Sequence, residues 1–224
     1  MSRSWRVACA VSALTAALFA AGTPAPASAE EIAFKPKAAG DINIRLRGIG
    51  VVPTERGAIK DANGGSTGLS ATLGNDYVPE VDVSYFVTSN IALELIAATT
   101  KHDVGASDGT NLGSIRLLPP TLTLQYHFAP TARFSPYIGA GLNYTFFYNE
   151  KKGALRSISY DDNIGYALQA GIDYAIAGAW SFNIDVKKLW LSTDVKANLT
   201  GVGPLKADVD INPLIFGVGL GYRF

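Results

Sequence analysis

Large apolar residues recur at every second position through most of this chain, and the last nine residues show the pattern most clearly. The ending FGVGLGYRF places five bulky residues, from Phe216 to Phe224, on one face of an extended strand, while the other face carries three glycines and Arg223. Side chains alternate between the two faces of a strand, so this period of two predicts β-structure. A soluble sheet usually presents polar side chains on its outer face. Here the face opposite the bulky one is almost empty.

The beginning of the chain predicts export. Arg3 and Arg6 form a basic start, the uncharged stretch 7–21 follows, and Ala27-Ser28-Ala29 offers a small-x-small cleavage site. The apolar stretch, about fifteen residues long, is shorter than the ~20 residues that a membrane-spanning helix needs. We therefore expect cleavage after Ala29, which makes residues 1–29 a signal peptide and residues 30–224 the mature chain.

The composition of the mature chain excludes several classes of function. Without Arg3 and Arg6 the 19 basic residues fall to 17, against 19 acidic ones, and this near-neutral balance argues against a nucleic-acid partner. The single cysteine, Cys9, lies in the expected signal peptide, so we expect neither a disulfide nor thiol chemistry. The remaining length suits one domain.

Eight runs of alternating apolar residues, each roughly 9–11 residues long, match the length of a membrane-crossing β-strand. The expected strands are 41–52, 77–87, 90–99, 121–128, 137–148, 163–174, 180–191 and 211–224. Short turns alternate with longer polar segments around 53–76, 100–118, 149–162 and 192–210, as in outer-membrane barrels. A sheet in lipid must close because no strand edge can stay unpaired. The sequence therefore predicts an all-β fold, an eight-stranded antiparallel transmembrane β-barrel.

The two faces of these strands differ in a way that predicts their orientation. One face carries large apolar residues on every strand, with aromatic residues near the strand ends, and the other carries charges that are seldom fully buried in a soluble core unless paired. We expect the apolar face to contact lipid. The alternative is a soluble lipocalin-like barrel with its apolar face inward. Large apolar residues on every strand, and the clustered aromatics, make this alternative the weaker one.

Several blocks of sequence resemble the OmpW family of small outer-membrane proteins. The blocks are AGDINIRLRG, NIALELIAATTKHDV, LLPPTLTLQYHFAP, SPYIGAGLNYTFFYNE, GYALQAGIDYAI and DVDINPLIFGVGLGYRF. The resemblance implies an eight-stranded barrel in the Gram-negative outer membrane that passes small hydrophobic molecules inward, alkanes in some members. It also implies that Leu220, Tyr222 and Phe224 form a signal read by the outer-membrane assembly machinery. The implied partners are outer-membrane lipid, that machinery and small hydrophobic solutes.

Strand direction sorts the inward residues by height, if the first strand runs outward from the periplasm. Near the extracellular end, these positions are apolar and form an expected ligand path: Ile49, Val51, Ile96, Phe147, Leu189, Leu191 and Ile215. Lower in the lumen they form an expected polar floor: Arg45, Arg47, Glu94, Asp173, Asp185 and Lys187. The inward glycines of the last strand would leave room for these long charged side chains. By the same reasoning Glu80 and Asp82 fall high, and Lys188 falls on the lipid face unless its strand bulges.

Two functions remain open from the sequence. In the first, an apolar extracellular funnel admits small hydrophobic molecules, which leave sideways into the bilayer because a charged floor is costly to cross. In the second, the inward apolar residues only pack a sealed lumen, which is the norm at this barrel size, and the protein is structural or receptor-like. Catalysis is disfavoured because His102 and His127 have no nucleophile or paired carboxylate at readable spacing. We expect no cofactor and no metal site.

Overall fold

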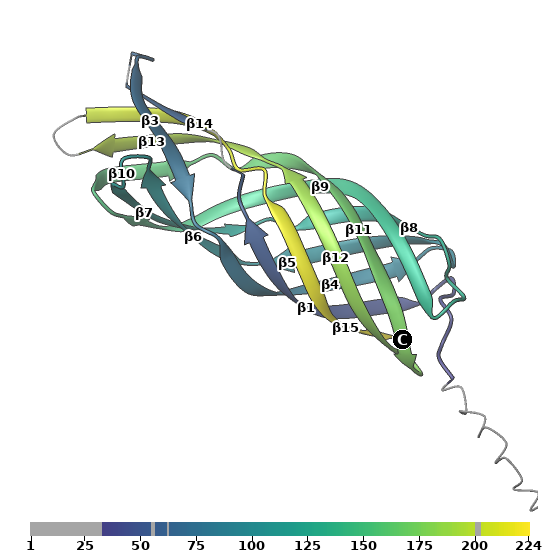
Figure 1. Cartoon of the computed structure of the whole chain (residues 1–224). Coiled ribbons are helices and arrows are strands. Elements are labelled where there is room, and N and C mark those ends of the chain that lie inside the picture. Colours follow the sequence, from purple (N-terminus) through teal and green to yellow (C-terminus); the bar gives the residue numbers. More distant parts are fainter. Residues whose placement is uncertain (1–32, 55–56, 62, 200–202) are drawn as a thin grey trace, which may run out of the picture. The chain divides into compact units, whose positions relative to one another are not determined.

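Eight long strands form a closed antiparallel barrel in the computed structural model of the chain (Figure 1). The structure describes residues 33–54, 57–61, 63–199 and 203–224, so the expected signal peptide, residues 1–29, lies outside the described residues. The barrel strands are β1 (Ile42–Val52), β4 (Asp76–Phe86), β5 (Ile91–Ala98), β8 (Thr121–His127), β9 (Phe134–Lys152), β11 (Asn163–Ala177), β12 (Trp180–Trp190) and β15 (Leu214–Arg223).

The barrel closes by pairing its last strand with its first. Strands β1 and β15 pair without a break from Asn43 opposite Arg223 to Val52 opposite Leu214. The remaining neighbours follow chain order, so each barrel strand pairs with the next. All eight expected strands are confirmed, with ends that differ by a few residues.

The four long segments extend the wall instead of forming polar loops. Among the described residues they contain β2 (Ala58–Asp61), β3 (Ser66–Leu73), β6 (Thr100–Ala106), β7 (Asn111–Leu118), β10 (Leu155–Tyr160), β13 (Ser192–Leu199) and β14 (Gly203–Asp210). These strands continue the sheet from the upper half of β9 in the order β7, β6, β3, β2, β14, β13 and β10. Figure 1 shows them beyond one end of the barrel, which we call the extended end. The opposite end carries the short turns.

The outer face of the barrel is apolar on every strand, as the alternation predicts. Leu46, Ile164 and Leu220 are among many large apolar side chains that are about half exposed or more. Aromatic rings gather at the short-turn end, where Trp180 packs edge-on against Tyr222 and Tyr222 against Phe224, with centroids 5.0 and 4.8 Å apart. Such belts lie at membrane interfaces. Within the described residues, no helix has the length and apolar character needed to cross a membrane.

Candidate functional site

The lower lumen is filled by a charged network centred on two arginines of β1. Arg45 lies 3.0 Å from Asp82, 2.7 Å from Glu94 and 3.1 Å from Asp173. Both ends of the guanidinium are therefore paired, and the side chain is fully buried.

Arg47, two residues further along the same face, extends this network upward. Its guanidinium lies 2.9 Å from Glu80, 2.8 Å from Asp82 and 2.5 Å from Asp185. Lys187 caps the upper side, 2.6 Å from Glu80 and 3.2 Å from Asp185. All six charges expected in the floor are thus brought together. Glu80 and Asp82 belong to the same network, so the polar floor of the structure consists of these six residues and these two carboxylates.

The expected height of Glu80 and Asp82 was wrong. The β1–β4 register places Arg47 opposite Glu80 and Arg45 opposite Asp82, so both carboxylates belong to the polar floor. Counting along one strand could not show this, because barrel strands are tilted and staggered relative to their neighbours.

Neutral side chains add hydrogen bonds to three carboxylates of the polar floor. Gln125 donates to Glu94 at 2.6 Å, Gln169 to Asp185 at 2.8 Å and Asn183 to Asp173 at 2.8 Å. Charges removed from water are tolerated only when paired and hydrogen-bonded. In the described part of the lower lumen each charge of the polar floor lies beside an opposite charge, so its cations are already compensated.

The glycine face of β15 provides the room for the arginines, as expected from the sequence. A Cβ at Gly221 would lie 3.2 Å from Cγ of Arg45, and one at Gly219 would lie 2.7 Å from Cγ of Arg47. One at Gly217 would meet a carboxylate oxygen of Asp185.

Lys37 closes the polar floor from the short-turn end, a role that the sequence reasoning missed. Its ammonium lies 2.8 Å from Asp173, 2.7 Å from the Ser135 hydroxyl and 2.7 Å from Nδ1 of His127. Burial lowers the pKa of Lys37 to about 8, against the opposing attraction of Asp173. The residue precedes the first strand, and no period marks it as inward. Only its place beside a charged lumen could have suggested it.

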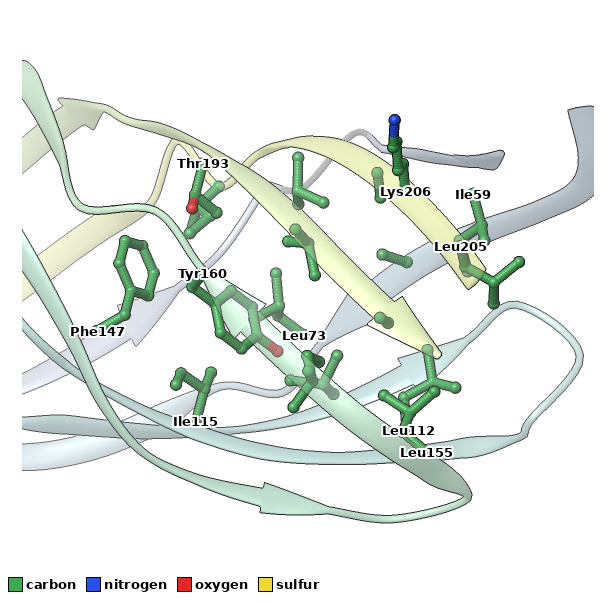
Figure 2. Close-up of a pocket in the computed structure, with 18 of the residues that line it drawn as sticks. Ile59, Leu73, Leu112, Ile115, Phe147, Leu155, Tyr160, Thr193, Leu205 and Lys206 are labelled. Carbon is green, nitrogen blue, oxygen red and sulfur yellow. The ribbon is translucent and has the colours of Figure 1, made fainter. Parts of the chain in front are cut away.

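The upper lumen is mostly apolar, and its described part contains two small cavities. The upper cavity, about 60 Å³, lies among the strands of the extended end (Figure 2). Phe147 and Tyr160 stack near one end of it, with centroids 5.5 Å apart, and Ile59, Leu112 and Leu205 lie toward the other. The lower cavity, about 40 Å³, lies above Glu80 and Lys187.

All seven expected ligand-path residues line these cavities. Phe147 lines the upper cavity, and the other six line the lower one: Ile49, Val51, Ile96, Leu189, Leu191 and Ile215. The inward placement of Leu189 and Leu191 is confirmed, because β12 pairs with β15 without a bulge at Lys188. Lys188 itself points outward and folds toward the extended end, donating to the Asn212 carbonyl and to Thr54.

Much of the upper cavity comes from residues that the sequence reasoning left in loops. Val104, Ile115, Leu117 and Val209 are buried there in one apolar cluster. Alternating apolar residues within 100–118, such as Ile115 and Leu117, were a usable signal for them.

The two cavities meet at Leu117 and Ile211, which line both. Each cavity is smaller than the roughly 150 Å³ apolar cavity that binds benzene. A hydrophobic molecule the size of benzene can therefore occupy the upper lumen only if the side chains that line the cavities move.

The barrel wall has an interruption beside the lower cavity. Pairing between β5 and β8 ends at Ile96 opposite Thr121, and pairing between β6 and β7 begins at Thr100 opposite Leu117. Residues 97–99 thus face residues 118–120 with no ladder between them, although the register is in phase on both sides. Pro119 and Pro120 cannot donate a backbone hydrogen bond. We call this interruption the wall gap; Ala98 and Pro119 on its two sides line the lower cavity.

Potential metal ligands and the environment of His102 bear on whether this lumen holds catalytic groups. Within the described ranges, no group of three His, Cys, Asp or Glu residues is placed to hold a metal ion. His102 is buried and contacts the Gly74 carbonyl and Thr100 through its two ring nitrogens.

Comparisons with known proteins agree with this architecture. Residues 38–224 match the OmpW family. The outer-membrane protein y4mB of Sinorhizobium fredii is 45% identical over 185 residues, covering 81% of this chain and 79% of that protein. The dibenzothiophene metabolism operon protein PahQ of Pseudomonas aeruginosa is 35% identical over 130 residues, covering 58% and 61%. The crystal structure of OprG from Pseudomonas aeruginosa matches with a TM-score of 0.81 at 30% identity, covering 86% of this chain and 99% of that chain.

Proposed function

The chain belongs to the OmpW family of outer-membrane proteins, and from that premise we propose that it admits small hydrophobic molecules through its apolar upper lumen. With the short turns in the periplasm, the extended end faces the outside. Solutes enter there, pass the two cavities and leave sideways through the wall gap into the bilayer. The proposal assigns the chain no catalytic step.

The observation that carries the proposal is the contrast between the two ends of one lumen. The upper part offers apolar cavities, and the lower part is closed by the polar floor and Lys37. Separating a buried ion pair costs several kcal/mol. For an apolar solute a straight path to the periplasm is therefore much costlier than an exit beside Pro119.

The kind of solute is supported by one relative's name. PahQ is named as a protein of a dibenzothiophene metabolism operon, and dibenzothiophene is an apolar aromatic molecule. The stacked Phe147 and Tyr160 rings at the upper cavity offer an apolar surface of matching chemistry.

The apolar outer stripe of the last strand has its own proposed role. Leu220, Tyr222 and Phe224 point outward at alternating positions at the end of the chain. We propose that the assembly machinery of the outer membrane reads this exposed stripe.

A second function is favoured by the small size of the cavities. Tight packing around Leu117 and Ile211 is also what a sealed structural or receptor-like barrel would show. The two functions differ in whether hydrophobic solutes pass through the lumen.

Uptake of a labelled hydrophobic solute such as an alkane, by cells with and without the protein, separates the two functions. We expect faster uptake with the protein, and a large loss of this gain when Phe147→Asp places a charge in the upper cavity. Arg116→Asp is the matched control, because Arg116 is exposed on the outer face of the extended end. Heat-dependent gel mobility would report folding of each variant. Equal uptake with and without the protein would favour the sealed barrel.

A further inference from the structure

Two neutral polar side chains are buried in the upper lumen without any partner. Asn143 and Thr145 of β9 are 2% and 0% exposed, and the Asn143 amide nitrogen and oxygen and the Thr145 hydroxyl make no hydrogen bond. Buried polar groups without partners are rare in folded proteins, and each costs about 1–3 kcal/mol.

Other unpaired atoms in the described lumen are different in kind. They belong to charged groups: Nε and Nη2 of Arg47, Oδ2 of Asp82, Oδ1 of Asp185 and Nε of Arg223. Each of these groups lies beside an opposite charge, at 2.5–2.9 Å for Arg47 with Glu80, Asp82 and Asp185, and at 3.4 Å for Arg223 with Asp41. Asn143 and Thr145 have neither a hydrogen bond nor an ion pair.

These two residues lie on the side of the lumen that carries the wall gap. Asn143 pairs with Thr121 across β8 and with Gly165 across β11. Thr121 lines the lower cavity and donates to the Pro119 carbonyl at 2.9 Å, and the Tyr144 amide donates to the Pro120 carbonyl at 3.1 Å. We call Thr121, Asn143 and Thr145 the polar ledge.

Thr121 is the ledge residue that lines the lower cavity itself, together with the polar residues Glu80, Thr100, His102 and Lys187. Another part of the lining is apolar. Ile49, Val51, Leu189 and Ile215 form one buried cluster there. At this height, therefore, the lumen has an apolar side and a hydrogen-bonding side. The Asn143 amide fits because its neighbour on β11, Gly165, has no side chain. A Cβ at Gly165 would lie only 2.6 Å from the amide oxygen of Asn143.

We propose that the polar ledge is a specificity site for the uncharged oxygen-bearing end of an otherwise apolar solute, such as an alcohol, aldehyde or ketone. This inference rests on the proposed function and narrows its substrate class. An amide and a hydroxyl each donate and accept hydrogen bonds. The ledge can therefore bind a neutral group that only accepts, such as an aldehyde or ketone, or one that also donates, such as an alcohol. It carries no charge, and Lys187 below it is already paired with Glu80 and Asp185, so a carboxylate gains nothing there.

The test compares 1-octanol with octane, which differ by one hydroxyl. Protein-dependent uptake of each is measured in cells that make the wild type, the double variant Asn143→Leu/Thr145→Val, or the control Thr72→Val/Asn198→Leu. The control makes the same exchanges outside the lumen, on β3 and β13. We expect the octanol-to-octane ratio to fall about five- to tenfold in the ledge variant, the size of one or more lost hydrogen bonds, and to stay unchanged in the control.

The outcomes separate the two proposals. Octane uptake with an unchanged ratio in the ledge variant would overturn the ledge and leave the proposed function standing; a permanently bound water at Asn143 would give this result. Protein-dependent uptake of neither solute would overturn both. The single variant Thr145→Val, nearly isosteric, keeps the test valid if the double variant does not fold, with an expected fall in the ratio of about threefold or more.

Discussion

The lower and upper halves of this lumen share the same strands but are closed by different physics. Below, Arg45 and Arg47 are held by carboxylates at 2.5–3.1 Å, and amide side chains donate further hydrogen bonds to Glu94 and Asp185. Above, Leu117, Leu191 and Ile211 close the space by packing alone. Apolar side chains can shift without leaving a charge unpaired, whereas breaking a buried ion pair costs about 3–5 kcal/mol. On the proposed function, we therefore expect passage only where apolar packing closes the lumen.

The largest expected difference between the halves comes from Arg47→Met. This change leaves Glu80, Asp82 and Asp185 without their shared cation, and breaking a buried pair costs about 3–5 kcal/mol. Ile49→Val, two residues further along the same inward face, is the matched change in the upper lumen and should cost about 0.5–1.5 kcal/mol. Urea unfolding in detergent micelles measures both. Equal losses would remove the distinction between the halves.

A smaller effect is expected where the backbone makes room for the polar floor. In Gly219→Ala the new methyl group would meet the Leu46 carbonyl and Arg47, so we expect a loss of about 1–3 kcal/mol in unfolding free energy. Gly48→Ala on the neighbouring strand is the control, because a Cβ there has nothing within 4 Å. If both variants unfold at the wild-type urea concentration, the glycine face is not what accommodates Arg47.

The smallest expected effect tests whether Lys37 is buried where it closes the polar floor from the short-turn end. Its pKa is lowered by burial from 10.5 to about 8, so between these values the unfolded chain holds a proton that the folded chain has lost. Stability therefore rises with pH in this window. Relative to Lys37→Met, the wild type should gain about 1–2 kcal/mol between pH 8 and pH 10. A difference that stays flat or falls with pH would show that Lys37 is not buried as described.

Single-strand alternation predicts what lies on each face, but it does not predict height. The inward placement of Ile49, Leu189 and the arginines follows from period two once the bulky apolar face is assigned to lipid. The positions of Glu80 and Asp82 depend on stagger between tilted strands, which no single strand encodes.

Contacts between segments that are far apart in the chain also could not be predicted from the sequence. Lys37 reaches Ser135 and Asp173 across about a hundred residues of chain or more, and no local pattern announces such a contact. The strands of the extended end were missed because their polar turn residues outweighed short apolar alternations such as Ile115 and Leu117. The polar ledge was missed because Asn143 lies between apolar residues of the strand 137–148, to which the sequence analysis gave no polar role in the lumen.

The proposed route out of the lumen is tested most directly by locking the wall gap. Thr99 and Leu118 continue the register between Ile96–Thr121 and Thr100–Leu117, so the pair Thr99→Cys/Leu118→Cys can bridge the gap by a disulfide. The control pair, Leu142→Cys/Tyr166→Cys, bridges a continuous ladder. Hydrophobic uptake is measured in each before and after reduction. We expect the oxidised gap pair to lose most of its protein-dependent uptake and to regain it on reduction, while the control is unaffected. Undiminished uptake through the oxidised gap pair would contradict lateral exit.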